Sequence, residues 1–149
     1  MSATPAPAGY SGTPLARKLG IKADARVGLI AAPEGFDATL GDLPDGVVVR
    51  RRLGREPFDV IVAFFSRRSA LERRLPGLAA ALDPAGGLWL AWPKRASGVP
   101  TDLSDVVVRD LGLAAGLVDN KVCAIDQVWS GLRLVYRLRD RPRGTATRT

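Results

Sequence analysis

The sequence predicts a three-layer α/β domain whose sheet is mainly parallel and closes with a C-terminal antiparallel hairpin. Residues 27–32 and, apart from Asp59, residues 58–65 are apolar without alternation, which is typical of strands buried on both faces. A run of leucines at helical spacing follows the second strand: Leu71, Leu75, Leu78 and Leu82. Residues 132–138 instead alternate, as in a half-exposed antiparallel strand. Strands that alternate with helices favour parallel pairing with right-handed crossovers.

The first third of the chain predicts one short helix, two strands and a turn. Thr13 is a good N-cap, Pro14 suits the first helical position, and Gly20 is a natural stop. The first strand is 27–32. The elements expected after it are a helical turn at 36–40, a tight turn at 43–46 and a second strand at 47–49.

The remaining elements follow in the same alternation. After the strand at 58–65, Ser66 is expected to cap a helix that Pro76 kinks or restarts. A turn at 83–87 then leads into a strand at 88–92 and an irregular loop at 93–100. Thr101 or Ser104 begins the next helix. The closing hairpin is expected to pair 121–125 with 132–138 and to turn near Ser130 and Gly131.

Composition indicates a single cytoplasmic domain. A chain of 149 residues can bury one sizeable core. We expect a loose N-terminal arm at 1–12, the folded domain at 13–138 and a disordered basic tail at 139–149. No secretory signal or bilayer-spanning run is evident, and a lone Cys123 cannot form an internal disulfide. No membrane association is expected.

The chain has no histidine, which removes histidine-based nucleophilic catalysis and imidazole metal ligands. No metal site and no catalytic residue are predicted. The net charge of +7 is concentrated near the C-terminus, because residues 133–149 hold six arginines and one aspartate. That tail is either solvated or contacts phosphates. Residues 1–132 carry sixteen basic and fourteen acidic residues, a net charge of only +2, so nucleic acid is not an expected partner of the folded domain.

The order of elements resembles class I S-adenosylmethionine (SAM) methyltransferases. The likeness rests on residues 15–32, on the FDVIV run at 58–62 and on LDPAGGL at 82–88. It implies a Rossmann-like, methyltransferase-like fold. The chain departs from that family where the family binds its cofactor. Residues 31–35 lack the glycine-rich turn, and Arg50 and Arg51 stand where the family has a carboxylate that binds the ribose hydroxyls. A short link at 53–57 replaces the family's third strand and its helix. SAM is thus possible but disfavoured, and no cofactor is predicted.

A second resemblance covers nearly the whole folded part. The segments GYSGTPLA at 9–16, WPK at 92–94, SGVPTDL at 97–103 and KVCA at 121–124 are similar to a family of short bacterial proteins known as a domain of unknown function. This resemblance implies a small methyltransferase-like domain and brings no established activity.

Ligands of open α/β sheets bind outside the carboxyl ends of the strands. That rule selects these candidate ligand-binding residues: Glu34, Gly35, Phe36, Ser66, Trp92, Lys94, Ser97, Gly98, Thr101, Asp102 and Lys121. Loop 92–103 is the best candidate for an anion or nucleotide site. Lys94 would pair with the negative charge of the ligand, and the Trp92 ring would stack against it. Alternatively Trp92 is core, Ser97 and Gly98 shape a turn, and Thr101 or Ser104 only caps.

Three functions are open from sequence. The first is a non-catalytic binding or regulatory module for an anionic small molecule or a protein partner. The alternative is a divergent SAM- or nucleotide-dependent small-molecule transferase. The second alternative is weak nucleic-acid association through the arginine-rich tail. Glu34 is either a general base or a cap, and Cys123 is expected to be a buried, inert thiol. The balance leans away from an enzyme.

Overall fold

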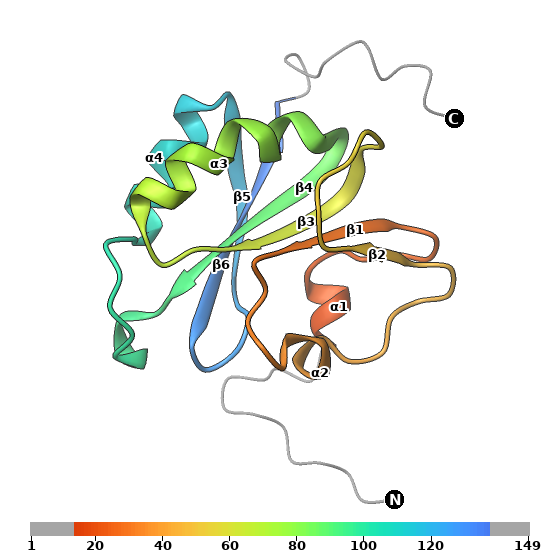
Figure 1. Ribbon diagram of the computed structural model, residues 1–149, viewed down its shortest axis with the longest axis horizontal. Helices are drawn as coiled ribbons and strands as arrows, with labels where there is room; N and C mark the ends of the chain where they lie inside the picture. Colours follow the sequence, from red (N-terminus) through yellow and green to blue (C-terminus); the bar gives the residue numbers. More distant parts are fainter. Residues whose placement is uncertain (1–13, 138–149) are drawn as a thin grey trace, which may run out of the picture.

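The computed structural model describes residues 14–137 and forms a six-stranded sheet with helices on both faces (Figure 1). The predicted arm, the predicted tail and the cap at Thr13 lie outside these residues. The elements in chain order are α1 (Leu15–Lys18), β1 (Arg26–Ile30), α2 (Phe36–Leu40), β2 (Val48–Arg50), β3 (Phe58–Phe64), α3 (Arg68–Ala81), β4 (Leu82–Pro93), the 3₁₀ turn η1 (Arg95–Ser97), α4 (Asp105–Ala114), β5 (Leu117–Ala124) and β6 (Trp129–Tyr136).

The strand order is β2-β1-β3-β4-β6-β5, which confirms the predicted fold class. The first four strands are parallel, with Leu29 opposite Val62 in the β1–β3 pair. β6 is antiparallel to both β4 and β5, and it places Leu132 opposite Leu90. On the other side β2 is the edge strand, and residues 51–57 lead directly to β3 without a further strand or helix. The predicted loss of a third strand is confirmed.

The sheet is buried on both faces because each face has its own apolar layer. α3 and α4 cover one face, and α1 and α2 cover the other (Figure 1). Two side-chain hydrogen bonds, one buried and one partly buried, tie helix ends to the sheet. Trp89 donates from Nε1 to the Leu19 carbonyl at 3.0 Å, and the Tyr136 hydroxyl donates to the Ala79 carbonyl at 2.6 Å. The Leu19 carbonyl lies at the end of α1, where the last carbonyls have no partner within the helix. The Ala79 carbonyl also accepts from the Leu82 amide at the end of α3.

Two predicted turns are wrong because the strands run further than their apolar runs suggest. Residues 83–87 belong to β4, which continues across two glycines beside an irregular register with β3. The hairpin does not turn at Ser130 and Gly131, which lie inside β6. Asp126 builds the turn instead, since its Oδ1 accepts from the amides of Val128 and Trp129 at 2.8 Å. The hairpin is also longer than predicted, because β5 begins at Leu117 rather than at residue 121.

The helix starts show one confirmed cap and one wrong one. Ser104 caps α4, because its side chain accepts from the Val107 amide at 3.2 Å. Ser66 does not cap α3, which begins after Arg67, and Asp102 accepts from the Arg68 amide at 2.7 Å. α3 also continues through Pro76 without a restart. Pro76 is exposed, so the missing amide hydrogen bond leaves a carbonyl on the solvent side of the helix.

The end of β1 holds an alanine in the left-handed region, where a Cβ is disfavoured. Ala31 has a φ of 58° and is exposed. We expect Ala31→Gly to raise the free energy of unfolding by about 0.5–1 kcal/mol, because glycine adopts this conformation without the steric cost. Urea denaturation measures the change. The matched control Ala80→Gly, on the exposed side of α3, should lower stability by about 1 kcal/mol. A loss of stability in both variants would contradict this explanation.

Candidate ligand-binding site at the strand ends

The carboxyl ends of β1, β3 and β4 meet at one edge of the sheet. The chain leaves β1 outward to β2 and returns to β3 on the other side, so the switch in strand order falls between β1 and β3. Ligands of open α/β sheets bind at such a switch point. The turn at 31–35 follows β1, and residues 65–67 follow β3.

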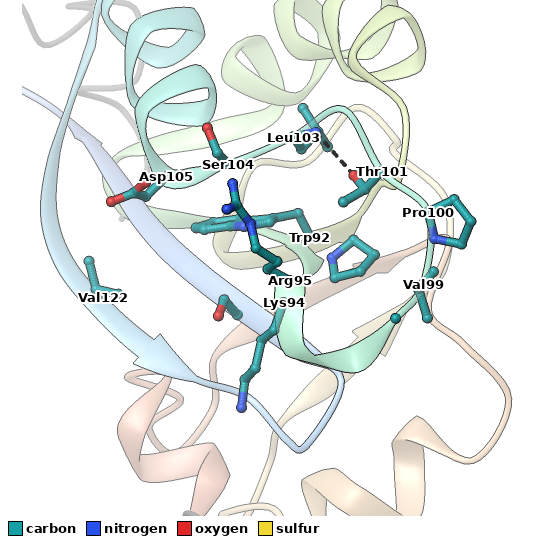
Figure 2. Close-up of a pocket in the computed structure, with 13 residues that line it drawn as sticks. Trp92, Lys94, Arg95, Val99, Pro100, Thr101, Leu103, Ser104, Asp105 and Val122 are labelled. Atoms are coloured by element: carbon teal, nitrogen blue, oxygen red, sulfur yellow. Dashed lines mark hydrogen bonds between the residues drawn. The ribbon is translucent and has the colours of Figure 1, made fainter.

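A pocket of about 590 Å³ lies further along the sheet, between the end of β4, the loop before α4 and the β5–β6 hairpin (Figure 2). Four of the predicted site residues line it: Trp92, Lys94, Gly98 and Thr101. The other lining residues are Pro93, Arg95, Val99, Pro100, Leu103, Ser104, Asp105, Val122 and Ser130. Residues of loop 92–103 therefore line a cavity.

Hydrogen bonds hold the pocket's loop against the turn that follows β3. The Thr101 hydroxyl donates to the Ser66 carbonyl at 2.7 Å and accepts from the Leu103 amide at 3.0 Å. The predicted site residues Ser66 and Asp102 thus support the wall without lining the pocket. Ser97 has the same kind of role, because its hydroxyl donates to the Lys94 carbonyl at 2.7 Å and accepts from the Val99 amide.

We expect Asp102→Ala to lower the free energy of unfolding by about 1 kcal/mol, the usual cost of losing a side-chain cap. The Asp102 carboxylate accepts from the first amide of α3, and it is the link that joins loop and helix. Thermal or urea unfolding measures the loss. Asp42→Ala, at an exposed loop position before β2, is the control and should be neutral. Equal stability of both variants would show that Asp102 does not cap α3.

The pocket combines a buried aromatic floor with two cations. Trp92 is buried, and Val99 and Val122 offer exposed apolar surface on either side. In Figure 2 the Arg95 side chain extends toward Ser104 at the start of α4, while Lys94 points to the opposite, open side. Neither cation forms an ion pair with any residue from 14 to 137. Such a pocket can hold a ligand with an apolar ring and an anionic group.

Four of the predicted residues lie elsewhere. Glu34 and Gly35 are exposed in the turn before α2, and Phe36 is buried with its ring 4.9 Å from that of Phe64. Phe36 is therefore a core residue. Lys121 is exposed on β5, one position before Val122. Because successive strand residues point to opposite faces, Lys121 lies on the face away from the pocket.

Sequence reasoning missed the contribution of the hairpin. Ser130 lies opposite Trp92 in the β4–β6 pair, and Val122 lies opposite Leu132 on the next strand. Neither residue carries a chemical signal in the sequence. Val122 stood in an apolar run and Ser130 in a predicted turn, so only the pairing of the strands reveals that they face the pocket.

The residue after β2, Arg51, forms an ion pair with a carboxylate from α2. Nη2 of Arg51 donates to both carboxylate oxygens of Asp37 on α2, at 2.6 and 2.9 Å. This hydrogen bond and the charge of Asp37 raise the pKa of Arg51 above its ordinary value. A carboxylate thus lies beside the end of β2, although it comes from α2.

Two further predictions concern metals and the thiol. Residues 14–137 contain no group of three or more acidic or thiol side chains placed to hold a metal ion. Cys123 is half-buried rather than fully buried, and burial raises the pKa of its thiol. The thiolate is therefore a minor form at neutral pH, which agrees with the expectation of an inert thiol.

No helix in the described part of the chain is long and apolar enough to cross a membrane.

This arrangement of sheet and helices is the fold of class I SAM-dependent methyltransferases. The chain is similar to DhpI in its complex with S-adenosylhomocysteine (SAH), with 13% identity, a TM-score of 0.59, and coverage of 85% of this chain and 83% of that one. A SAM-dependent methyltransferase from Aquifex aeolicus is 13% identical with a TM-score of 0.57, and the match covers 80% of this chain and 86% of that one. Fibrillarin from Methanococcus jannaschii, a pre-rRNA processing protein, is 16% identical with a TM-score of 0.55, and the match covers 78% of this chain and 68% of that one.

These likenesses establish the fold. No protein-family model matches the chain, and no curated protein sequence matches it. The resemblance to the short bacterial family therefore stays a prediction.

Proposed function

We propose that the chain is a divergent small-molecule transferase of the methyltransferase fold. It binds SAM or a related nucleoside at the β1–β3 switch point and an anionic acceptor in the pocket beside Trp92. The observation that carries this proposal is the direct contact between the two places. Thr101 in the pocket wall donates a hydrogen bond to Ser66, in the turn after β3. A solved neighbour of the same fold holds SAH, which supports a nucleoside ligand.

The residues at the switch point fit a nucleoside at two places. The Asp37 carboxylate beside the end of β2 can accept from ribose hydroxyls, while its ion pair with Arg51 fixes its position. In the turn after β1, Gly35 has a φ of 85° and no atom within 4 Å of its Cβ position, so a ligand can approach the backbone there. When bound, SAM supplies a methyl group on a sulfonium. Lys94 and Arg95 would orient the acceptor through its anionic group.

A non-catalytic binding or regulatory module is the second candidate. It is favoured by the composition of the switch point. α2 has only five residues, Ala31 stands where glycine is preferred, and Asp37 is already paired with a cation. The pocket wall includes no histidine or cysteine that could act as a base or nucleophile.

Calorimetric titration of the full chain with SAM and with SAH tests the proposal. We expect both to bind, and we expect Asp37→Asn to weaken binding about tenfold because a charged hydrogen-bond acceptor is lost. Asp42→Asn is the matched control and should bind like the unchanged protein. Conversion of SAM to SAH with a panel of small carboxylic acids then tests transfer.

The outcomes separate the two candidates. Binding that depends on Asp37, together with turnover, supports the transferase. Binding without turnover on any acceptor contradicts transfer and favours a module that senses the nucleoside. If neither ligand binds, the nucleoside site is wrong and the non-catalytic module for another anion takes its place.

A further inference from the structure

Two groups of arginines that are separate in the sequence lie together in the fold. One is in the link between β2 and β3, and the other is on α3. Leu53, in the middle of the link, packs against the core under α3, and its Cδ1 is 3.9 Å from the Cβ position of Gly77. Ala70, Arg74, Gly77 and Ala81 share one flank of the helix, because they recur at spacings of four, three and four. Figure 1 shows the link rising beside α3.

Arg74 therefore faces the link, in which Arg52 and Arg55 flank Leu53. We call the surface formed by Arg50, Arg52, Arg55, Arg67, Arg73 and Arg74 the α3 basic face. All six side chains belong to exposed residues.

The α3 basic face lacks its own counter-charges. Residues 50–74 contain eight arginines and only three acidic residues. Arg51 forms an ion pair with Asp37, with Nη2 2.6 Å from Oδ2. Arg68 forms one with Glu72, with Nε 3.2 Å from Oε2. The other six arginines form no ion pair within the described residues. Like charges at this density repel one another, so an anion that spans several of them gains from each contact.

We propose that the α3 basic face binds the phosphate backbone of a nucleic acid strand. α3 has fourteen residues, so it is about 21 Å long, which gives the face the length of several nucleotides. The N-terminal end of α3 is joined to the pocket loop through Asp102. A strand lying along the helix would thus reach the strand-end edge of the sheet. Arginines neutralise phosphates without reading bases, so the binding is independent of sequence.

This inference stands apart from the proposed transferase activity. It also places the contact elsewhere than the tail at 139–149, from which the sequence suggested nucleic-acid association, although residues 50–55 already formed a cluster able to bind phosphate. The reason is that two modest clusters become one surface only after Leu53 has docked on α3.

Fluorescence anisotropy with the full chain tests this surface. The probes are a labelled single-stranded RNA of about twelve nucleotides and a DNA of the same sequence. If about four phosphates are neutralised, the logarithm of the binding constant should fall with the logarithm of salt concentration with a slope of about −3. The triple variant Arg52→Glu, Arg55→Glu, Arg74→Glu should abolish binding to both. Arg17→Glu with Lys22→Glu, on the opposite face of the sheet, is the matched control and should retain it.

Three further variants keep the test decisive. Single replacements Arg52→Gln and Arg74→Gln should each reduce the salt slope by about 0.7 while the circular dichroism melt stays unchanged. They replace the triple variant if it does not fold. Replacing the tail arginines Arg139, Arg141, Arg143 and Arg148 with glutamine should leave the slope largely intact. Loss of binding in that tail variant alone, binding that ignores salt, or no binding to either strand would overturn the proposal.

Discussion

Replacing Trp89 with alanine is expected to lower the free energy of unfolding by about 3–5 kcal/mol. Trp89 is fully buried in β4, within the core under α1 and α2. Its loss leaves a large cavity, and it also removes the donor for the Leu19 carbonyl, which ends α1. A domain of this size has about 5–15 kcal/mol of stability, so the effect is a large share of the whole.

Urea denaturation followed by circular dichroism measures the loss, with Leu113→Ala on the exposed side of α4 as a control that should be nearly neutral. If Trp89→Ala does not fold, Trp89→Phe still tests the hydrogen bond. It keeps most of the apolar volume and should cost about 1–3 kcal/mol for the unsatisfied carbonyl. A neutral Trp89→Phe would show that the bond to Leu19 contributes nothing.

Gly86→Val is the second change with a large expected effect. A Cβ at Gly86 would lie 2.6 Å from the Asp59 carbonyl oxygen and 3.0 Å from that of Phe58. Both atoms belong to the backbone of β3, so neither can move aside as a flexible side chain would. We expect a loss of about 3 kcal/mol, at the upper end of the range for overpacking, and separation of β3 from the first part of β4.

Hydrogen exchange of the β3 and β4 amides localises this effect, and chemical denaturation gives its size. Gly54→Val is the matched control, because no atom lies within 4 Å of its Cβ position and its φ is not in the left-handed region. Equal stability of the two variants would mean that β3 and β4 are not in contact at Gly86.

Most of the fold could be predicted because its strands and helices carry strong local patterns. The apolar run at 60–65 and the leucines of α3 predicted the parallel part of the sheet and one covering helix. The short link after β2 also indicated that the third strand and its helix would be missing. Turns were predicted less well. Glycine and proline at 83–87 and the pair Ser130–Gly131 suggested turns, but both segments are extended because neighbouring strands supply hydrogen-bond partners.

The site was predictable only in part, since it depends on contacts between distant residues. Trp92, Lys94, Gly98 and Thr101 came from one loop, and the strand-end rule was enough to find them. Asp102 was selected as a ligand-binding residue, yet it caps a helix that begins 34 positions earlier in the chain. Nothing local to Ser130 or Arg74 shows that one faces the pocket and the other joins the α3 basic face.

Chemical shifts of the backbone amides during titration with SAH decide whether the strand-end edge, from the β1–β3 switch point to the pocket beside Trp92, is the ligand site. We expect shifts confined to residues 31–37, 65–67 and 92–105, with the largest beside Ser66 and Thr101, whose hydrogen bond joins the two places. Shifts centred on another surface, or none at saturating SAH, would contradict it.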